Sequence, residues 1–137
     1  MDFIIDNGHD GKKICNPSWT QIEKSLREID EDTCCFFILT ADTGSYLQCA
    51  GGQFAVTLEF REMLNGSFKH FVLGKGQVTG ALKTIWTTID CRVGPIRIHK
   101  DEVLTLADAI AAFAHFFEKS AVLPALTRRN VTKHFDV

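Results

Sequence analysis

Residues 54–73 read Phe-Ala-Val-Thr-Leu-Glu-Phe-Arg-Glu-Met-Leu-Asn-Gly-Ser-Phe-Lys-His-Phe-Val-Leu, and this stretch decides the fold class. Large apolar residues alternate with small or polar ones from Phe54 to Arg61, which is the period of a strand with one buried face. Asn65-Gly66 is a favoured pair for a two-residue turn, so residues 68–73 are expected to return as a second antiparallel strand. The side chains expected on the core face are Phe54, Val56, Leu58 and Phe60.

Other segments with a strand pattern flank this hairpin on both sides. Residues 34–39 form a continuous apolar run, and residues 46–50 alternate in part after a turn. Residues 6–15 are rich in turn-forming residues and residues 74–83 are rich in glycine, so we expect loops there. The remaining short strands are expected at 2–5, 84–89 and 96–99.

Two segments have the period of an amphipathic helix. Ser18 and Gln21 have the spacing of a capping box, and the apolar residues that follow predict a helix over about 17–30. Thr105 and Asp108 have the same spacing ahead of a second helix. The two buried stripes are expected to contain Trp19, Ile22, Leu26 and Ile29, and Leu106, Ala109, Ile110, Phe113, Phe116 and Phe117.

These elements predict an α+β fold within a single domain that covers residues 1–137. Its centre is an antiparallel sheet of five or six strands. We expect the two helices to cover one face of the sheet and the other face to be partly open.

The five cysteines are expected to be free thiols. Their number is odd and their surroundings are apolar, which suits a reducing compartment better than a disulfide framework. No apolar run approaches the roughly 20 residues needed to span a bilayer, and residues 1–6 lack a signal-peptide pattern. We therefore expect a cytoplasmic protein with no membrane partner. The cysteines are Cys15, Cys34, Cys35, Cys49 and Cys91.

The sequence contains no recognisable motif of a catalytic or metal site. The spacings CxxC, HxH, HExxH and GxSxG are absent. Cys49 is the one thiol near a turn, while Glu59 and Glu62 differ by three positions and should lie on opposite faces of a strand. We expect Glu59 to pair with Arg61 or Lys69 at the solvent face. No catalytic residue, cofactor or metal is expected.

Charge is distributed unevenly along the chain. Residues 1–66 carry five Lys and Arg against eleven Asp and Glu, and residues 67–137 carry ten against six, which gives net charges of −6 and +4. An acidic face repels nucleic acid and attracts basic proteins. The pI of about 6.2 also argues against direct binding of nucleic acid. We therefore expect a basic protein as the partner.

The candidate partner-binding residues are carboxylates near the first helix and the first turn of the sheet. They form one acidic surface if the end of the helix and the turn at 42–45 lie on the same edge of the molecule. This condition is part of the prediction. The candidate residues are Glu28, Asp30, Glu31, Asp32 and Asp42.

The order of several segments resembles the first-described family of immunity proteins from bacterial polymorphic toxin systems. The likeness spans most of residues 17–135, although the tryptophan that the family carries near its C-terminal tail is absent here. The segments that carry the resemblance are Ser18-Trp19-Thr20-Gln21-Ile22, Tyr46-Leu47-Gln48-Cys49-Ala50-Gly51-Gly52, Phe54 through Arg61-Glu62, Leu123-Pro124 and Arg129-Asn130-Val131-Thr132.

The resemblance implies a small cytoplasmic α+β inhibitor that binds a cognate toxin domain and performs no catalysis. The toxins of such systems include nucleic-acid deaminases and nucleases. Two alternatives from the residues alone stay open. One is a small enzyme with a pocket over the open sheet face. The other is an adaptor that forms a homodimer through its apolar sheet face or an edge strand.

Overall fold

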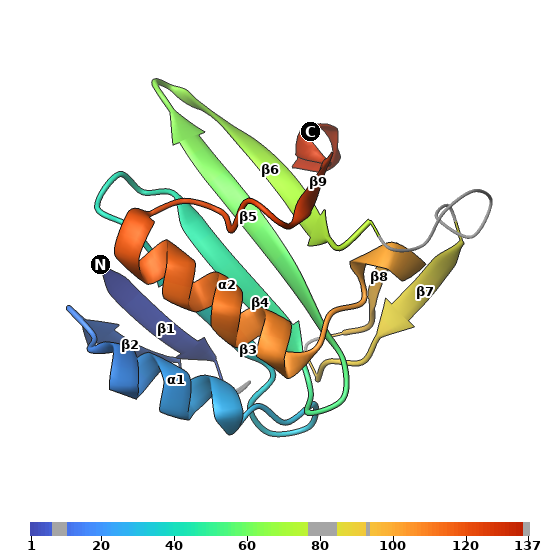
Figure 1. Cartoon of the computed structure of the whole chain (residues 1–137), viewed down its shortest axis with the longest axis horizontal. Helices are drawn as coiled ribbons and strands as arrows, with labels where there is room; N and C mark the ends of the chain where they lie inside the picture. Colours follow the sequence, from blue (N-terminus) through green and yellow to red (C-terminus); the bar gives the residue numbers. More distant parts are fainter. Residues whose placement is uncertain (7–10, 77–84, 93, 136–137) are drawn as a thin grey trace.

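A computed structural model describes residues 1–6, 11–76, 85–92 and 94–135. Its centre is a seven-stranded sheet with the order β2-β1-β3-β4-β5-β6-β9, in which every neighbouring pair is antiparallel (Figure 1). The fold is therefore α+β, as predicted. The strands of this sheet are β1 (Asp2–Asp6), β2 (Lys12–Cys15), β3 (Phe36–Thr40), β4 (Tyr46–Gly51), β5 (Val56–Leu64), β6 (Ser67–Gly74) and β9 (Thr127–Asn130).

The sheet has more strands than the five or six predicted, because both of its edges come from segments without a strand pattern. β2 lies in the expected loop at 6–15, and β9 lies in a polar tail. The side chains of both strands are mostly exposed, so apolar alternation is not required there. Most of the expected loop at 74–83 lies outside the described residues.

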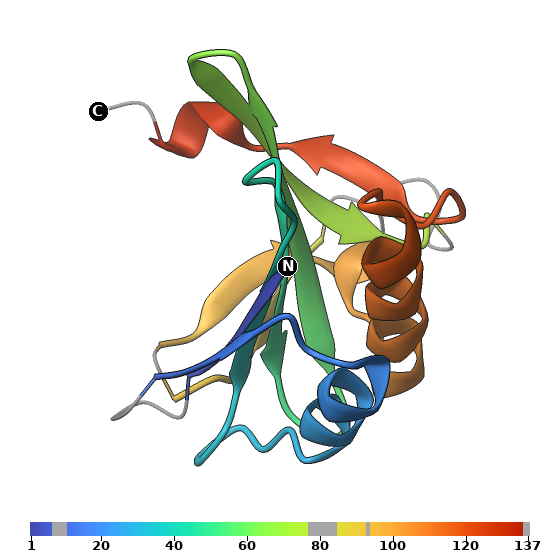
Figure 2. The same ribbon diagram turned by 90° about the vertical axis from the view of Figure 1, so that its left-hand side faces the viewer.

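The expected strands at 84–89 and 96–99 form but do not join the main sheet. β7 (Trp86–Ile89) and β8 (Ile96–His99) pair with each other as a separate hairpin. Figure 2 shows this hairpin and the two helices on opposite sides of the sheet. Ile89 and Ile98 of the hairpin pack against Val72 and Val131, so the hairpin covers part of the face that the sequence pattern left open.

Both helices begin at the predicted capping boxes and lie on one face of the sheet. In α1 (Trp19–Arg27), the Ser18 hydroxyl accepts a hydrogen bond from the Gln21 amide, and in α2 (Leu106–Lys119) Thr105 and Asp108 repeat this arrangement. Within the described residues, no helix is long and apolar enough to cross a membrane. The fully buried side chains between helices and sheet include Phe3, Ile22, Leu26, Phe37, Leu39, Leu58, Phe113 and Phe116.

The prediction for Phe54 is wrong. β5 begins at Val56, and the preceding residues turn sharply, with Gly51 at a φ of 142° and the Gly52 amide bonded to the Ala55 carbonyl. Only Val56, Leu58 and Phe60 of the predicted alternating face are buried. Phe54 is 98% exposed, since the alternation includes a residue that lies before the strand begins.

Candidate functional site

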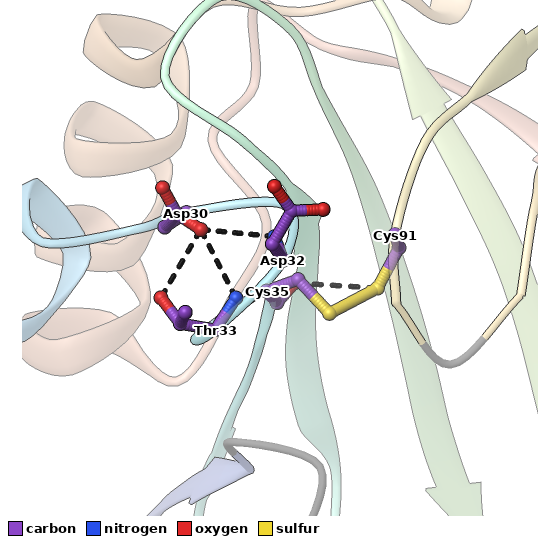
Figure 3. Close-up of a disulfide and its surroundings, with 5 residues drawn as sticks. All are labelled: Asp30, Asp32, Thr33, Cys35 and Cys91. Atoms are coloured by element: carbon purple, nitrogen blue, oxygen red, sulfur yellow. Dashed lines mark hydrogen bonds between the residues drawn. A yellow bond between two sulfur atoms is a disulfide. The ribbon is translucent and has the colours of Figure 1, made fainter.

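The loop between α1 and β3 is organised by the carboxylate of Asp30. Its Oδ1 atom accepts hydrogen bonds from the Asp32 amide at 2.9 Å, the Thr33 amide at 3.0 Å and the Thr33 hydroxyl at 3.1 Å (Figure 3). These bonds, led by the one from the Asp32 amide, lower the pKa of Asp30, because they stabilise the charged form. Asp30 therefore holds the shape of the loop and keeps a negative charge on it.

Four of the five candidate carboxylates gather around this loop. Glu28 is the C-cap residue of α1, and Asp30, Glu31 and Asp32 follow it, all four exposed to solvent. Burial raises the pKa of the nearby Cys34 thiol, and the charges of Glu28 and Asp30 raise it further. Among the described residues, no salt bridge involves any of these four carboxylates.

Asp42 does not belong to this group, so the predicted set of five is wrong as a single surface. It follows β3, whereas residues 28–32 precede that strand. Five residues of strand at ~3.3 Å each place the two regions about 17 Å apart, at opposite ends of the sheet. There, Asp42 forms an ion pair at 3.1 Å with the amino group of Met1.

A disulfide joins the start of β3 to the β7–β8 hairpin. Cys35 and Cys91 are 56 positions apart in sequence and bonded through their sulfur atoms, with Cα atoms 5.7 Å apart (Figure 3). The prediction of five free thiols is therefore wrong, and three remain free. The pairing depends on the hairpin folding across the sheet, which no local spacing indicates. The inference of a reducing compartment from the cysteines loses its basis.

The disulfide brings a further carboxylate to the loop. The Arg92 amide donates a hydrogen bond to the Glu31 carbonyl at 2.9 Å, which fixes the turn after β7 against the loop. An open hollow of about 420 Å³ lies between them, and Asp90 and Arg92 line it beside Glu31 and Asp32. The acidic end of the molecule comprises Glu28, Asp30, Glu31, Asp32 and Asp90.

Phe54 is held next to the acidic end. The Gln53 side chain donates hydrogen bonds to the carbonyls of Arg27 and Ile29, which ties the turn before β5 to the end of α1. A Cβ atom built on Gly52 would lie 3.2 Å from the Cβ of Glu31, so the two loops are in close contact. Two residues further on, the Phe54 ring projects almost wholly into solvent. The acidic end therefore borders an exposed aromatic side chain.

A polar network on the other sheet face contains the buried residue His70. One ring nitrogen lies 2.7 Å from a carboxylate oxygen of Glu59, and the other accepts a hydrogen bond from Arg61 at 3.1 Å. Glu59 thus pairs with His70 in place of the expected Arg61 or Lys69. Both nitrogens of His70 are engaged, and its side chain is 2% exposed. This arrangement fixes β5 against β6.

Cys49 and Glu62, which were also considered in the sequence, do not belong to the acidic end. Cys49 is fully buried on the helix-facing side of β4, and burial raises the pKa of its thiol to about 12. A thiol with so high a pKa is a poor nucleophile at neutral pH. Glu62 lies opposite Lys69 in the β5–β6 pair, three positions from Glu59.

No protein-family model matches the chain, and no curated protein matches its sequence. Sequence reasoning located the acidic loop but missed Phe54 and Asp90. For Phe54, the glycine pair at 51–52 is a signal that the strand starts later. For Asp90, no local signal exists, because its place depends on a contact between distant segments.

Proposed function

We propose that this chain is a non-catalytic immunity protein that binds and neutralises a cognate bacterial toxin domain through the acidic end and Phe54. The observation that carries the proposal is the combination of exposed carboxylates, none of them in a salt bridge between described residues, with a fully exposed phenylalanine at the same end. The resemblance described above supports the same function. The toxin is proposed to be a nucleic-acid-targeting deaminase or nuclease.

The charges suit a partner of this class. An enzyme that acts on nucleic acid presents cations to phosphates, and clustered carboxylates are complementary to such a surface. Electrostatic attraction raises the rate of encounter between the two proteins. Because the Asp30 carboxylate is already hydrogen-bonded within its loop, the loop keeps its shape on binding. The conformational entropy lost on association is therefore reduced.

Phe54 provides the apolar contact that a charged surface alone lacks. Energetically dominant interface residues are commonly large side chains near the centre of the interface, surrounded by more polar residues. The turn that carries Phe54 is fixed by the hydrogen bonds of Gln53 to α1. The ring is thus presented by a rigid support, as an anchor for a pocket on the toxin.

Neutralising three of the carboxylates should slow association with the toxin. In the variant Glu28→Gln, Glu31→Gln, Asp32→Asn, we expect a lower association rate and a weaker dependence of that rate on salt, since screening acts over about 8–10 Å at physiological ionic strength. Asp30 is kept because its loop depends on it. The measurement is binding kinetics at low and high salt against a toxin-like protein domain, if one is encoded immediately upstream of this chain's gene.

Asp42→Asn is the matched control, because it removes one carboxylate from the opposite end of β3. It should bind like the unmodified protein. Protection of cells that express the toxin is the biological readout. Failure of the unmodified protein to bind or protect would contradict the proposed function. Unchanged kinetics of the triple variant at both salts would contradict only the assignment of the acidic end.

Replacing Phe54 with alanine should weaken the complex mainly by accelerating dissociation. Truncation of an anchoring aromatic residue typically costs about 2 kcal/mol or more of binding free energy, which corresponds to roughly a 30-fold loss of affinity. The same binding measurement gives the dissociation rate. Phe135→Ala, at another exposed phenylalanine far along the chain, is the control. An unchanged dissociation rate for Phe54→Ala would place the apolar contact elsewhere.

The charged residues on both edge strands argue against a dimer that forms through a sheet edge. β2 carries Lys12 and Lys13, and β9 carries Arg128 and Arg129. Charged residues on edge strands oppose pairing with a second copy of the same strand. A cytoplasmic location is part of the proposal and rests on the resemblance.

A further inference from the structure

We propose that His99, Asp101 and Glu102 form a binding site for a divalent transition-metal ion of the Zn²⁺ class. The three residues lie at the end of β8 and in the short 3-10 helix η2 (Lys100–Glu102). One potential ligand atom from each lies within 4.8 Å of the others, a spacing that a single ion can bridge after small side-chain movements.

An unpartnered buried oxygen is the second observation that points to a ligand. Asp101 is only 7% exposed, and its Oδ1 atom has no hydrogen-bond partner among the described residues. Buried carboxylate oxygens are ordinarily satisfied by donors or by metal ions. The main chain of Asp101 is held in place, since its carbonyl accepts a hydrogen bond from the Lys75 amide at 3.0 Å. The backbone of Asp101 is therefore fixed at a position where its Oδ1 atom is buried without a partner among the described residues.

The carboxylate of Glu102 can accept one further bond. Glu102 is 3% exposed and accepts two bonds from Arg129, at 2.7 and 2.9 Å, and one from the His99 amide at 2.7 Å. A carboxylate offers about four acceptor positions, so Oε2, which among the described residues receives only the Arg129 Nε bond, retains one. Glu102 can therefore bind an ion without releasing Arg129.

The charge balance and the donor types fit a transition-metal dication. Asp101 and Glu102 supply two carboxylates, and among the described residues only that of Glu102 is in a salt bridge, with Arg129. Imidazole suits Zn²⁺ and related ions, whereas Mg²⁺ and Ca²⁺ prefer oxygen ligands alone. His99 is half-buried against the Trp86 ring, with ring centroids 4.4 Å apart, so solvent can complete the coordination shell.

The spacing His99-x-Asp101-Glu102 belongs to none of the motifs considered above, so the sequence pattern did not indicate this site. The prediction of no metal came from the absence of familiar spacings. The geometry of one tight turn brings the donors together without such a spacing.

The test is titration of the purified full chain with Zn²⁺ by calorimetry, followed by thermal unfolding with and without the ion. We expect a single site with a dissociation constant in the micromolar range or tighter, and a higher unfolding midpoint, because the ion binds only the folded state. His99→Ala and Asp101→Asn should each weaken binding by at least about tenfold. Mg²⁺ at the same concentration should not compete.

Two controls separate this site from other metal-binding groups. His115→Ala removes a histidine on α2, and Asp90→Asn removes a carboxylate from the acidic end, and both should bind Zn²⁺ normally. Should the site variants fail to fold, paramagnetic broadening of amide NMR signals by Co²⁺ in the unmodified protein locates the ion. Broadening centred on residues 99–102 supports the proposal. Millimolar binding, equal binding by the site variants, or broadening centred on residues 28–32 would overturn it.

Discussion

Phe113→Ala should lower the free energy of unfolding by about 3–5 kcal/mol. Phe113 lies on α2, is 0% exposed and belongs to the main core between the helices and the sheet. Truncation removes apolar burial and leaves a cavity that the surrounding sheet and helices can fill only in part. The measurement is the midpoint and slope of chemical denaturation at equilibrium.

Phe54→Ala is the matched control for this measurement, since it makes the same chemical change at a residue that is 98% exposed. Its stability should differ by no more than about 0.5 kcal/mol from that of the unmodified protein. Similar losses in the two variants would show that the buried face of α2 is wrongly assigned. The two phenylalanines thus separate the core from the proposed binding surface.

Reduction of the Cys35–Cys91 disulfide should destabilise the protein by about 4 kcal/mol. The bond closes a loop of 56 positions, and in the chain-entropy account a loop of this length restricts the unfolded state by about that amount. Both cysteines are buried with Ala50, so their packing should persist after reduction. The measurement is chemical denaturation with and without reductant.

A count of reactive thiols tests the bond directly. Protein unfolded without reductant should show three thiols, and reduced protein should show five. In the double variant Cys35→Ala, Cys91→Ala, reductant should leave the stability unchanged. Five thiols in the unreduced protein would contradict the disulfide and restore the original expectation.

The parts of the fold that sequence reasoning predicted are those with a strong local pattern. The capping boxes at Ser18 and Thr105 are confirmed, because a side chain and an amide three residues apart need no other part of the chain to form a hydrogen bond. The β5–β6 hairpin is also confirmed, because the two-residue turn at Asn65-Gly66 joins strands that are adjacent in sequence. Trp19 and Phe117 are only half-buried at the edge of the core, where they contact each other.

The candidate site was predicted in part. Residues 28–32 are adjacent in sequence, so their clustering on one loop follows from the chain itself. Asp42 was added on the assumption that two loops share an edge, and the length of β3 separates them. Asp90 and Phe54 join the site only because the Cys35–Cys91 bond and the Gln53 hydrogen bonds connect segments that are distant in sequence.

The sequence by itself determined the α+β class, the two helices, the central antiparallel strands and the acidic loop after the first helix. These features depend on side-chain periodicity and on hydrogen bonds between near neighbours, which the order of residues specifies directly. The tertiary structure decided the two edge strands, the position of the β7–β8 hairpin across the sheet, the disulfide and the cluster of His99, Asp101 and Glu102. Packing between whole elements determines those features, because the free energy of burying an apolar face depends on which distant segment covers it.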